Sequence, residues 1–204
     1  MGYLYLDTET TSLNPGQICE ISMILEDEGQ LKGASNLFFK VDSMDPGAQS
    51  IHGFSMEKLD ELSSGKTFKD YYESILPVLS GNTLIAHNLP FDEKFISTEM
   101  WRCGVSFKPA GRFDTMEFFR DVIKIPAKSK RYGPYKSPKL TEVIDFLRID
   151  IAKVKALADR IFGTAIYSYH DSRLDTTALY VIVNIYREMT SGTGSTAWRD
   201  QFCF

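Results

Sequence analysis

The sequence predicts an α/β protein in which helices flank a mixed β-sheet. Three strand-like segments come first in the chain, and two more follow, interleaved with helical segments. A run of strands followed by strands that alternate with helices is typical of layered α/β folds. The 204 residues are enough for one such domain with its own apolar core.

The first part of the chain predicts an antiparallel meander of three strands. The expected strands are Tyr3–Leu6, Ile18–Leu25 and Asn36–Val41. Each consists mainly of apolar or β-branched residues, and turn residues follow the first two, at Asn14-Pro15-Gly16 and Glu28-Gly29. Consecutive strands are usually neighbours, so we expect these three to lie side by side.

Helices and two further strands are expected in the rest of the chain. Short apolar runs predict strands over Thr83–Ala86 and Arg112–Thr115. Apolar residues at helical spacing, together with helix-start residues, predict the helices. These run from Ser55 to Leu62, Phe68 to Leu79, Phe91 to Cys103, Ser137 to Leu147, Ala152 to Phe162, and about Asp175 to Met189.

We therefore expect one domain over residues 1–190 and a C-terminal tail over residues 191–204. The tail is rich in Gly, Ser and Thr and also contains Trp198, Phe202 and Phe204. Two interpretations of these aromatic residues remain open. They pack on the body of the domain, or they form a tag that a partner binds.

Acidic residues stand at the ends of several predicted strands and helices. Asp7 and Glu9 are two residues apart at the end of the first strand, so their side chains share one face. Asp92 follows the fourth strand, and Asp175 begins the last helix. Taken singly, each is explained more simply by solvent exposure or by favourable charge at a helix N-terminus.

Taken together with His170, the four carboxylates indicate a phosphoryl-transfer site that uses two metal ions. Hard cations such as Mg²⁺ and Mn²⁺ prefer oxygen ligands. Two such ions about 4 Å apart can activate an attacking water and stabilise the leaving oxygen. A histidine whose pKa lies near neutrality suits removal of the proton from that water.

Three motifs in a fixed order carry a resemblance to the DEDDh exonucleases. They are Leu6-Asp7-Thr8-Glu9-Thr10-Thr11-Ser12-Leu13, Ala86-His87-Asn88-Leu89-Pro90-Phe91-Asp92, and His170 to Asp175; Ile51–Ser55 and Phe113–Thr115 also match. The sequence is similar to this family over roughly residues 3–189. The family includes the epsilon subunit of bacterial DNA polymerase III, ribonuclease T and the TREX-type enzymes.

The resemblance implies a ribonuclease-H-like fold, with a five-stranded mixed sheet flanked by helices. It also implies 3′→5′ hydrolysis that releases nucleoside 5′-monophosphates. By matching position, His170 is the general base, and two Mg²⁺ ions, for which Mn²⁺ can substitute, are bound by Asp7, Glu9, Asp92 and Asp175. Substrate-binding residues by the same matching are Thr8, Thr10, Leu13, His52 and Asn88, with Leu13 as an apolar wedge against the terminal base.

The expected substrate is the 3′ end of single-stranded or frayed DNA, in proofreading or repair, with a polymerase or a repair protein as partner. An exoribonuclease that trims RNA ends is the alternative, because one sequence does not reveal recognition of the 2′-hydroxyl. A non-catalytic binding module is disfavoured, because it has no chemical need for four carboxylates and His170. The Asp92 motif and the His170–Asp175 spacing disfavour an endonuclease of the ribonuclease H type.

One strongly basic segment stands out in a chain whose formal net charge is −4. The segment Lys124–Lys139 contains six cationic residues and no Asp or Glu, and it also contains Tyr132 and Tyr135. Two interpretations are equally supported. One is a solvated loop, and the other is an arm whose cations neutralise phosphates and whose tyrosines stack on bases.

The expected location is the cytoplasm, with no membrane partner. The N-terminus has neither the basic nor the apolar region of a signal peptide, and no apolar run is long enough to span a bilayer. The three cysteines are widely spaced, which predicts neither a disulfide framework nor a zinc site. The negative net charge does not exclude nucleic acid, because part of it belongs to a site that cations would neutralise.

Overall fold

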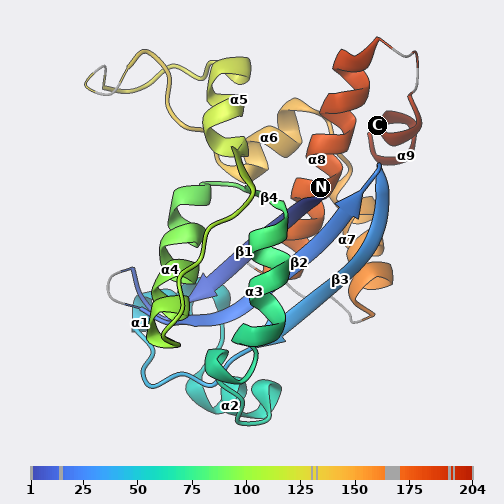
Figure 1. Ribbon diagram of the computed structural model, residues 1–204. Coiled ribbons are helices and arrows are strands. Elements are labelled where there is room, and N and C mark those ends of the chain that lie inside the picture. The colour runs from blue at the N-terminus through green and yellow to red at the C-terminus, as the bar shows by residue number, and fades with distance from the viewer. Residues whose placement is uncertain are drawn as a thin grey trace.

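Five strands form one sheet in the computed structural model, which describes residues 2–13, 16–129, 131, 133–163, 171–192, 194 and 196–203 (Figure 1). The strands are β1 (Tyr3–Thr10), β2 (Ile18–Asp27), β3 (Gln30–Phe38), β4 (Thr83–Ala86) and β5 (Gly111–Asp114). Their order is β3-β2-β1-β4-β5. The first three pair antiparallel, and β4 and β5 run parallel to β1. The predicted α/β class, mixed sheet and meander are confirmed.

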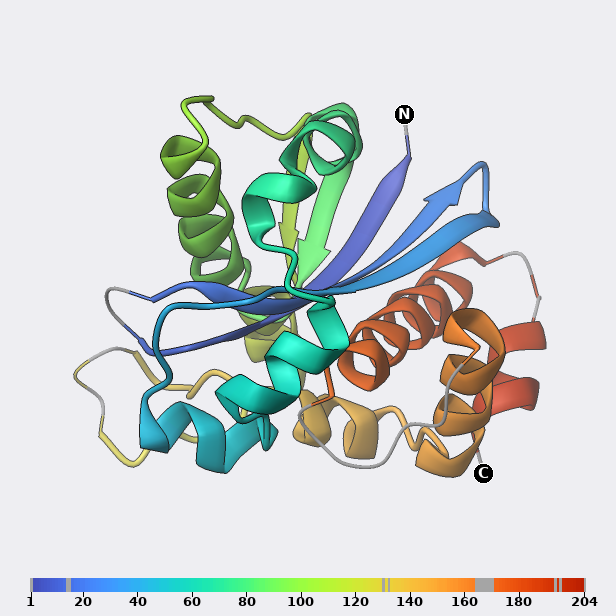
Figure 2. The same ribbon diagram turned by 90° about the horizontal axis from the view of Figure 1, so that it is seen from below.

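Helices cover both faces of this sheet. In chain order they are α1 (Pro46–His52), α2 (Met56–Ser63), the 3₁₀ helix η1 (Phe68–Asp70), α3 (Tyr72–Gly81), α4 (Leu89–Arg102), α5 (Thr115–Ile123), α6 (Leu140–Phe146), α7 (Ile151–Phe162), α8 (Ser172–Ser191) and α9 (Ala197–Phe202). Figure 2 shows α3 and α4 on one face and α7 and α8 on the other. The sheet is therefore the middle layer of three.

Side chains of β1 alternate between these two helical layers. Leu4 and Leu6 belong to the apolar cluster that α3 and α4 complete. Tyr5 belongs to the cluster on the α8 face, where its ring meets that of Tyr180 edge to face at a centroid distance of 5.2 Å. Because alternate side chains share a face, this packing determines which helix each polar residue at the end of β1 will meet.

Several elements differ from the sequence-based expectation. Strand β3 begins at Gln30, six residues before the expected Asn36, because an edge strand with a largely solvated surface lacks an apolar pattern. The helix expected from Phe68 breaks after η1, and α3 follows. Helices α1, α5 and α9 were not expected at all, because they are short and each depends on tertiary contacts for its stability.

The last helices start at different residues from those expected. Helix α6 begins at Leu140 rather than near Ser137, and α8 begins at Ser172 rather than Asp175. The side chain of Asp171 accepts a hydrogen bond from the backbone N–H of Arg173 and caps α8. Asp175 therefore lies in the first turn of the helix instead of at its start.

The C-terminal helix docks on the body of the protein. Phe202 is buried in the apolar cluster that α6 and α8 form, and its carbonyl accepts a hydrogen bond from the backbone N–H of Asp150 at 2.7 Å. This supports packing rather than a free tag for this aromatic residue. The division into residues 1–190 and 191–204 stays a prediction. The three cysteines are free thiols, and none of the described helices has the length and apolarity needed to cross a bilayer.

Candidate active site

Four carboxylates predicted from sequence come from three separate elements. Asp7 and Glu9 follow Tyr5 in alternation on β1 and therefore face α8. Asp175 lies in the first turn of α8. Asp92 lies in the first turn of α4, on the other side of the sheet, and is only 3% exposed. The fold thus brings residues from 7 to 175 to the carboxyl end of β1.

A pair of hydrogen bonds joins the α4 side of the site to β1. Thr8 points away from α8, and its hydroxyl donates to Oδ1 of Asp92 at 2.8 Å. The backbone N–H of Thr8 donates to the same oxygen at 3.1 Å. Because both residues are buried, these bonds determine the orientation of the Asp92 carboxylate relative to the strand end.

The start of α8 is held against β2 by a second set of polar contacts. The hydroxyls of Ser22 and Ser172 are hydrogen-bonded at 2.6 Å. Asp171 accepts two hydrogen bonds from the guanidinium of Arg173, at 2.8 and 2.6 Å. The side chain of Asp171 is buried, and it serves both as the cap of α8 and as the ion-pair partner of Arg173. These contacts place Asp175 beside the end of β1.

Burial and mutual repulsion raise the pKa of the two β1 carboxylates. The pKa of Asp7 is raised well above its ordinary value, first by desolvation and then by the charges of Asp175, Asp92 and Glu9. The pKa of Glu9 is raised to about 9 by desolvation and by the charges of Glu20 and Asp175. All the main influences on these two groups oppose ionisation, so the site favours protons or cations.

The other two carboxylates show the same trend. Desolvation raises the pKa of Asp92 to about 7, although the hydrogen bonds from Thr8 act in the opposite direction. Desolvation, followed by the charge of Asp171, raises the pKa of Asp175 to about 7. Four interacting carboxylates with elevated pKa values in one place are typical of a functional site rather than of a structural ion-pair network.

A fifth carboxylate, Glu20, was not among the sequence-based candidates. It lies opposite Glu9 in the β1–β2 pairing and is fully buried, and neither carboxylate oxygen has a regular hydrogen bond among the described residues. Desolvation and then the charge of Asp171 raise its pKa to about 7, while nearby Asn36, Arg173 and Ser172 act to lower it. The sequence does contain a signal for Glu20, because it is a charged residue inside the apolar run Ile18–Leu25.

The chemistry of these side chains fits divalent cations such as Mg²⁺ or Mn²⁺. All the donors are carboxylate oxygens, which these hard ions prefer, and the two buried oxygens of Glu20 have no hydrogen-bond partner among the described residues. The described part of the chain contains no group of three or more His, Cys, Asp or Glu residues already arranged around a single point. The fit therefore rests on donor chemistry and burial.

Two cavities flank the carboxylates. The larger, about 590 Å³, is lined by Asp7 and Asp175 and also by Asn88 and the segment from Ser137 to Thr141. The smaller, about 340 Å³, is lined by Glu9 and by several residues expected to bind substrate. Those expected residues in the smaller cavity are Thr8, Thr10, Leu13 and His52.

The smaller cavity has an apolar rim and a buried polar floor. Leu13 and Ile51 are exposed, at 78% and 58% of their surface, and Phe91 also lines the cavity. Thr10 is buried, and its hydroxyl donates to the carbonyl of Ser12. His52 is buried and stacked on Phe54. This arrangement can hold a flat, apolar group such as a base beside Glu9.

The second motif is supported by residues that follow β5. Asn88 adopts a left-handed conformation with φ of 80°, and its backbone N–H donates to Oδ1 of Asp114 at 3.0 Å. Asp114 also caps α5 by accepting a hydrogen bond from the backbone N–H of Met116. The expected general base, His170, lies outside the described residues, which resume at Asp171.

Comparisons with known proteins identify relatives of this chain. The profile of the RNase_T family, whose description is exonuclease, matches residues 4–180. The 3′-5′ exonuclease DinG of Staphylococcus saprophyticus is 29% identical over 121 residues, which are 58% of this chain and 13% of that protein. The DNA polymerase III epsilon subunit of Haemophilus influenzae is 26% identical over 198 residues, which are 93% of this chain and 67% of that protein.

A solved structure shares the fold. Escherichia coli exonuclease I, in complex with a dA16 oligonucleotide, superposes with a TM-score of 0.65 and 15% identity. The match covers 92% of this chain and 41% of exonuclease I. The ribonuclease-H-like fold implied by the motifs is therefore confirmed. The chain corresponds to only a small part of DinG and to less than half of exonuclease I.

Proposed function

Because this chain belongs to the RNase_T exonuclease family, we propose that it hydrolyses phosphodiester bonds from the 3′ end of DNA and releases nucleoside 5′-monophosphates. One observation carries the proposal. Asp7, Glu9, Asp92 and Asp175 come from β1, α4 and α8, and the charges of Asp92 and Asp175 lie close enough to raise the pKa values of Asp7 and Glu9. A fold without such chemistry has no reason to gather four carboxylates, one buried and three half-buried, at one place.

Two divalent ions, Mg²⁺ in the first place, would be held by these four carboxylates. Bound there, they would supply activation of the attacking water and stabilisation of the leaving oxygen. The protein holds the metal-binding carboxylates in position. Thr8 orients Asp92 through two hydrogen bonds, and the Ser22–Ser172 contact holds the helix that carries Asp175.

The terminal nucleotide is proposed to occupy the smaller cavity. Leu13 and Ile51 offer apolar surface to the base, and Thr8, Thr10 and His52 line the same space next to Glu9. Asn88 lies in the larger cavity, on the side of Asp7 and Asp175. His170 is proposed to accept the proton of the attacking water, since it directly precedes the buried start of α8.

DNA is the proposed substrate, in proofreading or repair, with a polymerase or a repair protein as partner. Similarity to an epsilon subunit of DNA polymerase III supports this choice, as does the shared fold with an exonuclease I that binds a deoxyoligonucleotide. The carboxylates would act equally on RNA, so the substrate test must include both polymers.

The test is a time course on 5′-labelled single-stranded DNA and RNA of the same sequence, with Mg²⁺, Mn²⁺ or EDTA. Stepwise shortening from the 3′ end that needs metal is the expected result, faster on DNA. Asp7→Ala should abolish it, whereas the matched control Asp145→Ala, at an exposed position on α6, should not. Faster shortening of RNA would show that RNA, rather than DNA, is the preferred substrate. Binding of either strand without cleavage would favour a non-catalytic binding module.

A further inference from the structure

Strand β2 carries two buried glutamates, Glu20 and Glu26, whose surroundings differ. They lie on the same face of the strand, because they are an even number of positions apart, and neither is more than 1% exposed. Glu26 accepts hydrogen bonds from the hydroxyl of Tyr5 at 2.6 Å and from the guanidinium of Arg187 at 2.7 Å. Neither oxygen of Glu20 has a hydrogen-bond partner among the described residues. The fold therefore satisfies one buried carboxylate of this strand and leaves the other without compensation.

The serine hydroxyls beside Glu20 donate their hydrogens elsewhere. Ser172 and Asn36 lie close enough to Glu20 to lower its pKa. Ser22 donates to Oδ1 of Asn36 at 2.7 Å, so its oxygen must accept, rather than donate, in the 2.6 Å bond with Ser172. Both serine hydrogens are used within this chain of hydroxyls. Glu20 therefore borders a polar network that gives it no hydroxyl donor.

The ion pair next to Glu20 supplies no net positive charge to it. Asp171 and Arg173 are joined at 2.6 Å, and the charge of Asp171 raises the pKa of Glu20 by more than that of Arg173 lowers it. An ionised carboxylate held away from water is costly unless a cation lies near it. Compensation for Glu20 must therefore come from a cation that the protein itself does not supply.

Glu20 lies on the inner side of the candidate metal site. It stands opposite Glu9 in the β1–β2 pairing, where directly opposed side chains have Cβ atoms about 4.5–5.5 Å apart. After desolvation, its charge is the largest influence that raises the pKa of Glu9, and it also raises that of Asp7. Glu9 is half-buried and lines the smaller cavity, whereas Glu20 is fully buried. The charge of Glu20 therefore acts on the metal-binding residues from behind, on the side away from solvent.

We propose that Glu20 is a positioning residue of the metal site, whose buried charge strengthens the binding of the divalent cation that Glu9 holds. This rests on the proposed exonuclease function. Glu20 does not ligate the cation, because it lies behind Glu9 and is closed off from solvent. Its uncompensated charge destabilises the protein without metal, and a cation bound beside Glu9 removes that effect. At this residue, stability without metal and affinity for metal are thereby opposed.

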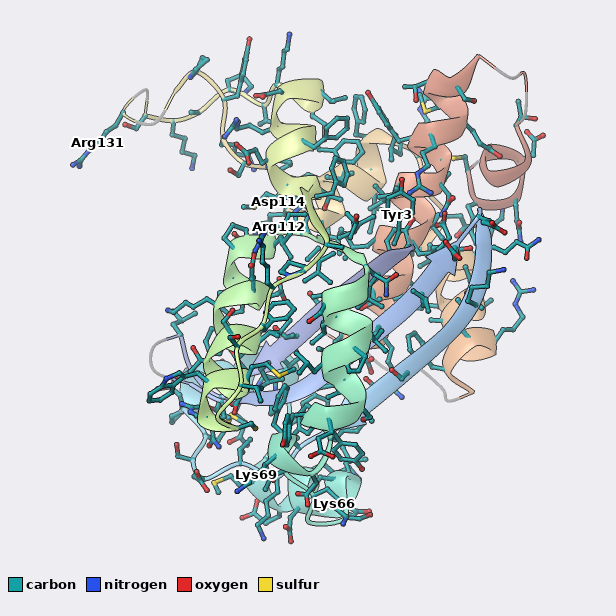
Figure 3. All side chains as sticks on the ribbon, viewed as in Figure 1. Tyr3, Lys66, Lys69, Arg112, Asp114 and Arg131 are labelled. Carbon is teal, nitrogen blue, oxygen red and sulfur yellow. The ribbon has the colours of Figure 1, made fainter. Side chains whose placement is uncertain are left out.

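The test measures the binding of Mg²⁺ and Mn²⁺ to the full chain by isothermal titration calorimetry at pH 8, without nucleic acid. Glu20→Gln keeps the shape of the side chain and removes its charge, whereas Glu20→Asp keeps the charge and shortens the side chain. Glu26→Gln is the matched control, on the same face of β2 and about 20 Å away at about 3.3 Å per residue. Glu26 pairs with Tyr3, which Figure 3 labels at the start of β1, the end away from the site.

Glu20→Gln should weaken the binding of both ions by about 10–100-fold, as expected when a residue that supports metal ligands is lost. Glu20→Asp should keep most of the affinity, and Glu26→Gln should keep all of it. Thermal unfolding in EDTA should give the reverse order. Glu20→Gln should melt at a higher temperature than the wild-type protein, whereas Glu26→Gln should melt at a lower one, because Arg187 loses its ion-pair partner.

The contrary outcomes are distinguishable. Unchanged affinity in Glu20→Gln, while the wild-type protein binds metal and cleaves, overturns the role of Glu20 and leaves the exonuclease proposal intact. Weaker binding in Glu20→Asp than in Glu20→Gln would assign the effect to packing and would overturn that role as well. Equal weakening in Glu20→Gln and Glu26→Gln would show a general loss of structure, with the same consequence. A wild-type protein that neither binds metal nor cleaves would overturn both proposals.

Discussion

Thr8 donates two hydrogen bonds to one oxygen of Asp92, although the two residues are 84 positions apart in the sequence. One bond comes from the backbone N–H of Thr8 and the other from its hydroxyl. The end of β1 and the first turn of α4 are thereby joined at the site itself. The hydroxyl is the part of this link that a substitution can remove.

Thr8→Val should weaken metal binding or activity by about 10–100-fold, because a partner that orients a metal ligand is lost while the side-chain shape is retained. The measurement is the Mg²⁺ concentration that gives half-maximal hydrolysis. Thr8→Ser keeps the hydroxyl and should therefore retain most of the wild-type metal binding and activity. An unchanged Mg²⁺ requirement in the valine variant would show that Thr8 does not orient Asp92.

Stability without metal should fall as the pH rises. Raised pKa values mean that the folded protein binds more protons than the unfolded chain, so the free energy of unfolding declines with pH. The decline starts near the ordinary carboxyl values of about 4 and ends at about 7 for Asp92 and Asp175 and about 9 for Glu9. Thermal unfolding in EDTA from pH 5 to 9 measures it, and Mg²⁺ should remove most of it. A stability that rises over this range would contradict the site.

Glu20→Gln should reduce this pH dependence. The rise in the pKa of Glu20 from 4.5 to about 7 corresponds to about 3 kcal/mol at about 1.4 kcal/mol per pKa unit. Glutamine has a similar shape but does not ionise. The part of the decline in unfolding free energy between pH 4 and 7 that is due to Glu20 should therefore disappear. Urea unfolding at both ends of the range provides the comparison. Exposed Glu28→Gln is the control and should leave the dependence unchanged.

His170→Ala should lower the rate constant for hydrolysis by about 10²–10⁴-fold, because the group that accepts the proton of the attacking water is removed. Oligonucleotide affinity in Ca²⁺ should change little. Single-turnover kinetics separates these two quantities. Full activity in this variant would exclude His170 as the base and direct attention to another proton acceptor.

Leu13→Ala should raise KM roughly tenfold with a smaller change in kcat, because it removes an apolar contact of about 1.5 kcal/mol with the terminal base. Leu13 is 78% exposed at the rim of the smaller cavity. Leu31→Ala, at another exposed leucine on the edge strand β3, is the matched control. The measurement is steady-state kinetics on an oligonucleotide. Equal changes in KM for the two variants would contradict the role of Leu13 as a wedge.

The sequence by itself determined the α/β class, the meander, and the carboxylates Asp7, Glu9, Asp92 and Asp175 as candidates. These features depend on local rules. Alternation in a strand places residues two apart on one face, and turn or capping residues mark where elements end. The motif order added the family, which the match over residues 4–180 shows.

Only the tertiary structure decided which residues support those carboxylates. The Ser22–Ser172 contact, the hydrogen bonds from Thr8 to Asp92, and the cavity that Asp7 shares with Pro138 all require distant segments to meet. Propensity and spacing describe each segment alone, whereas burial and charge interactions depend on what packs against it. Asp171, for example, is buried at the start of α8, which contacts β2 through Ser172 and Ser22.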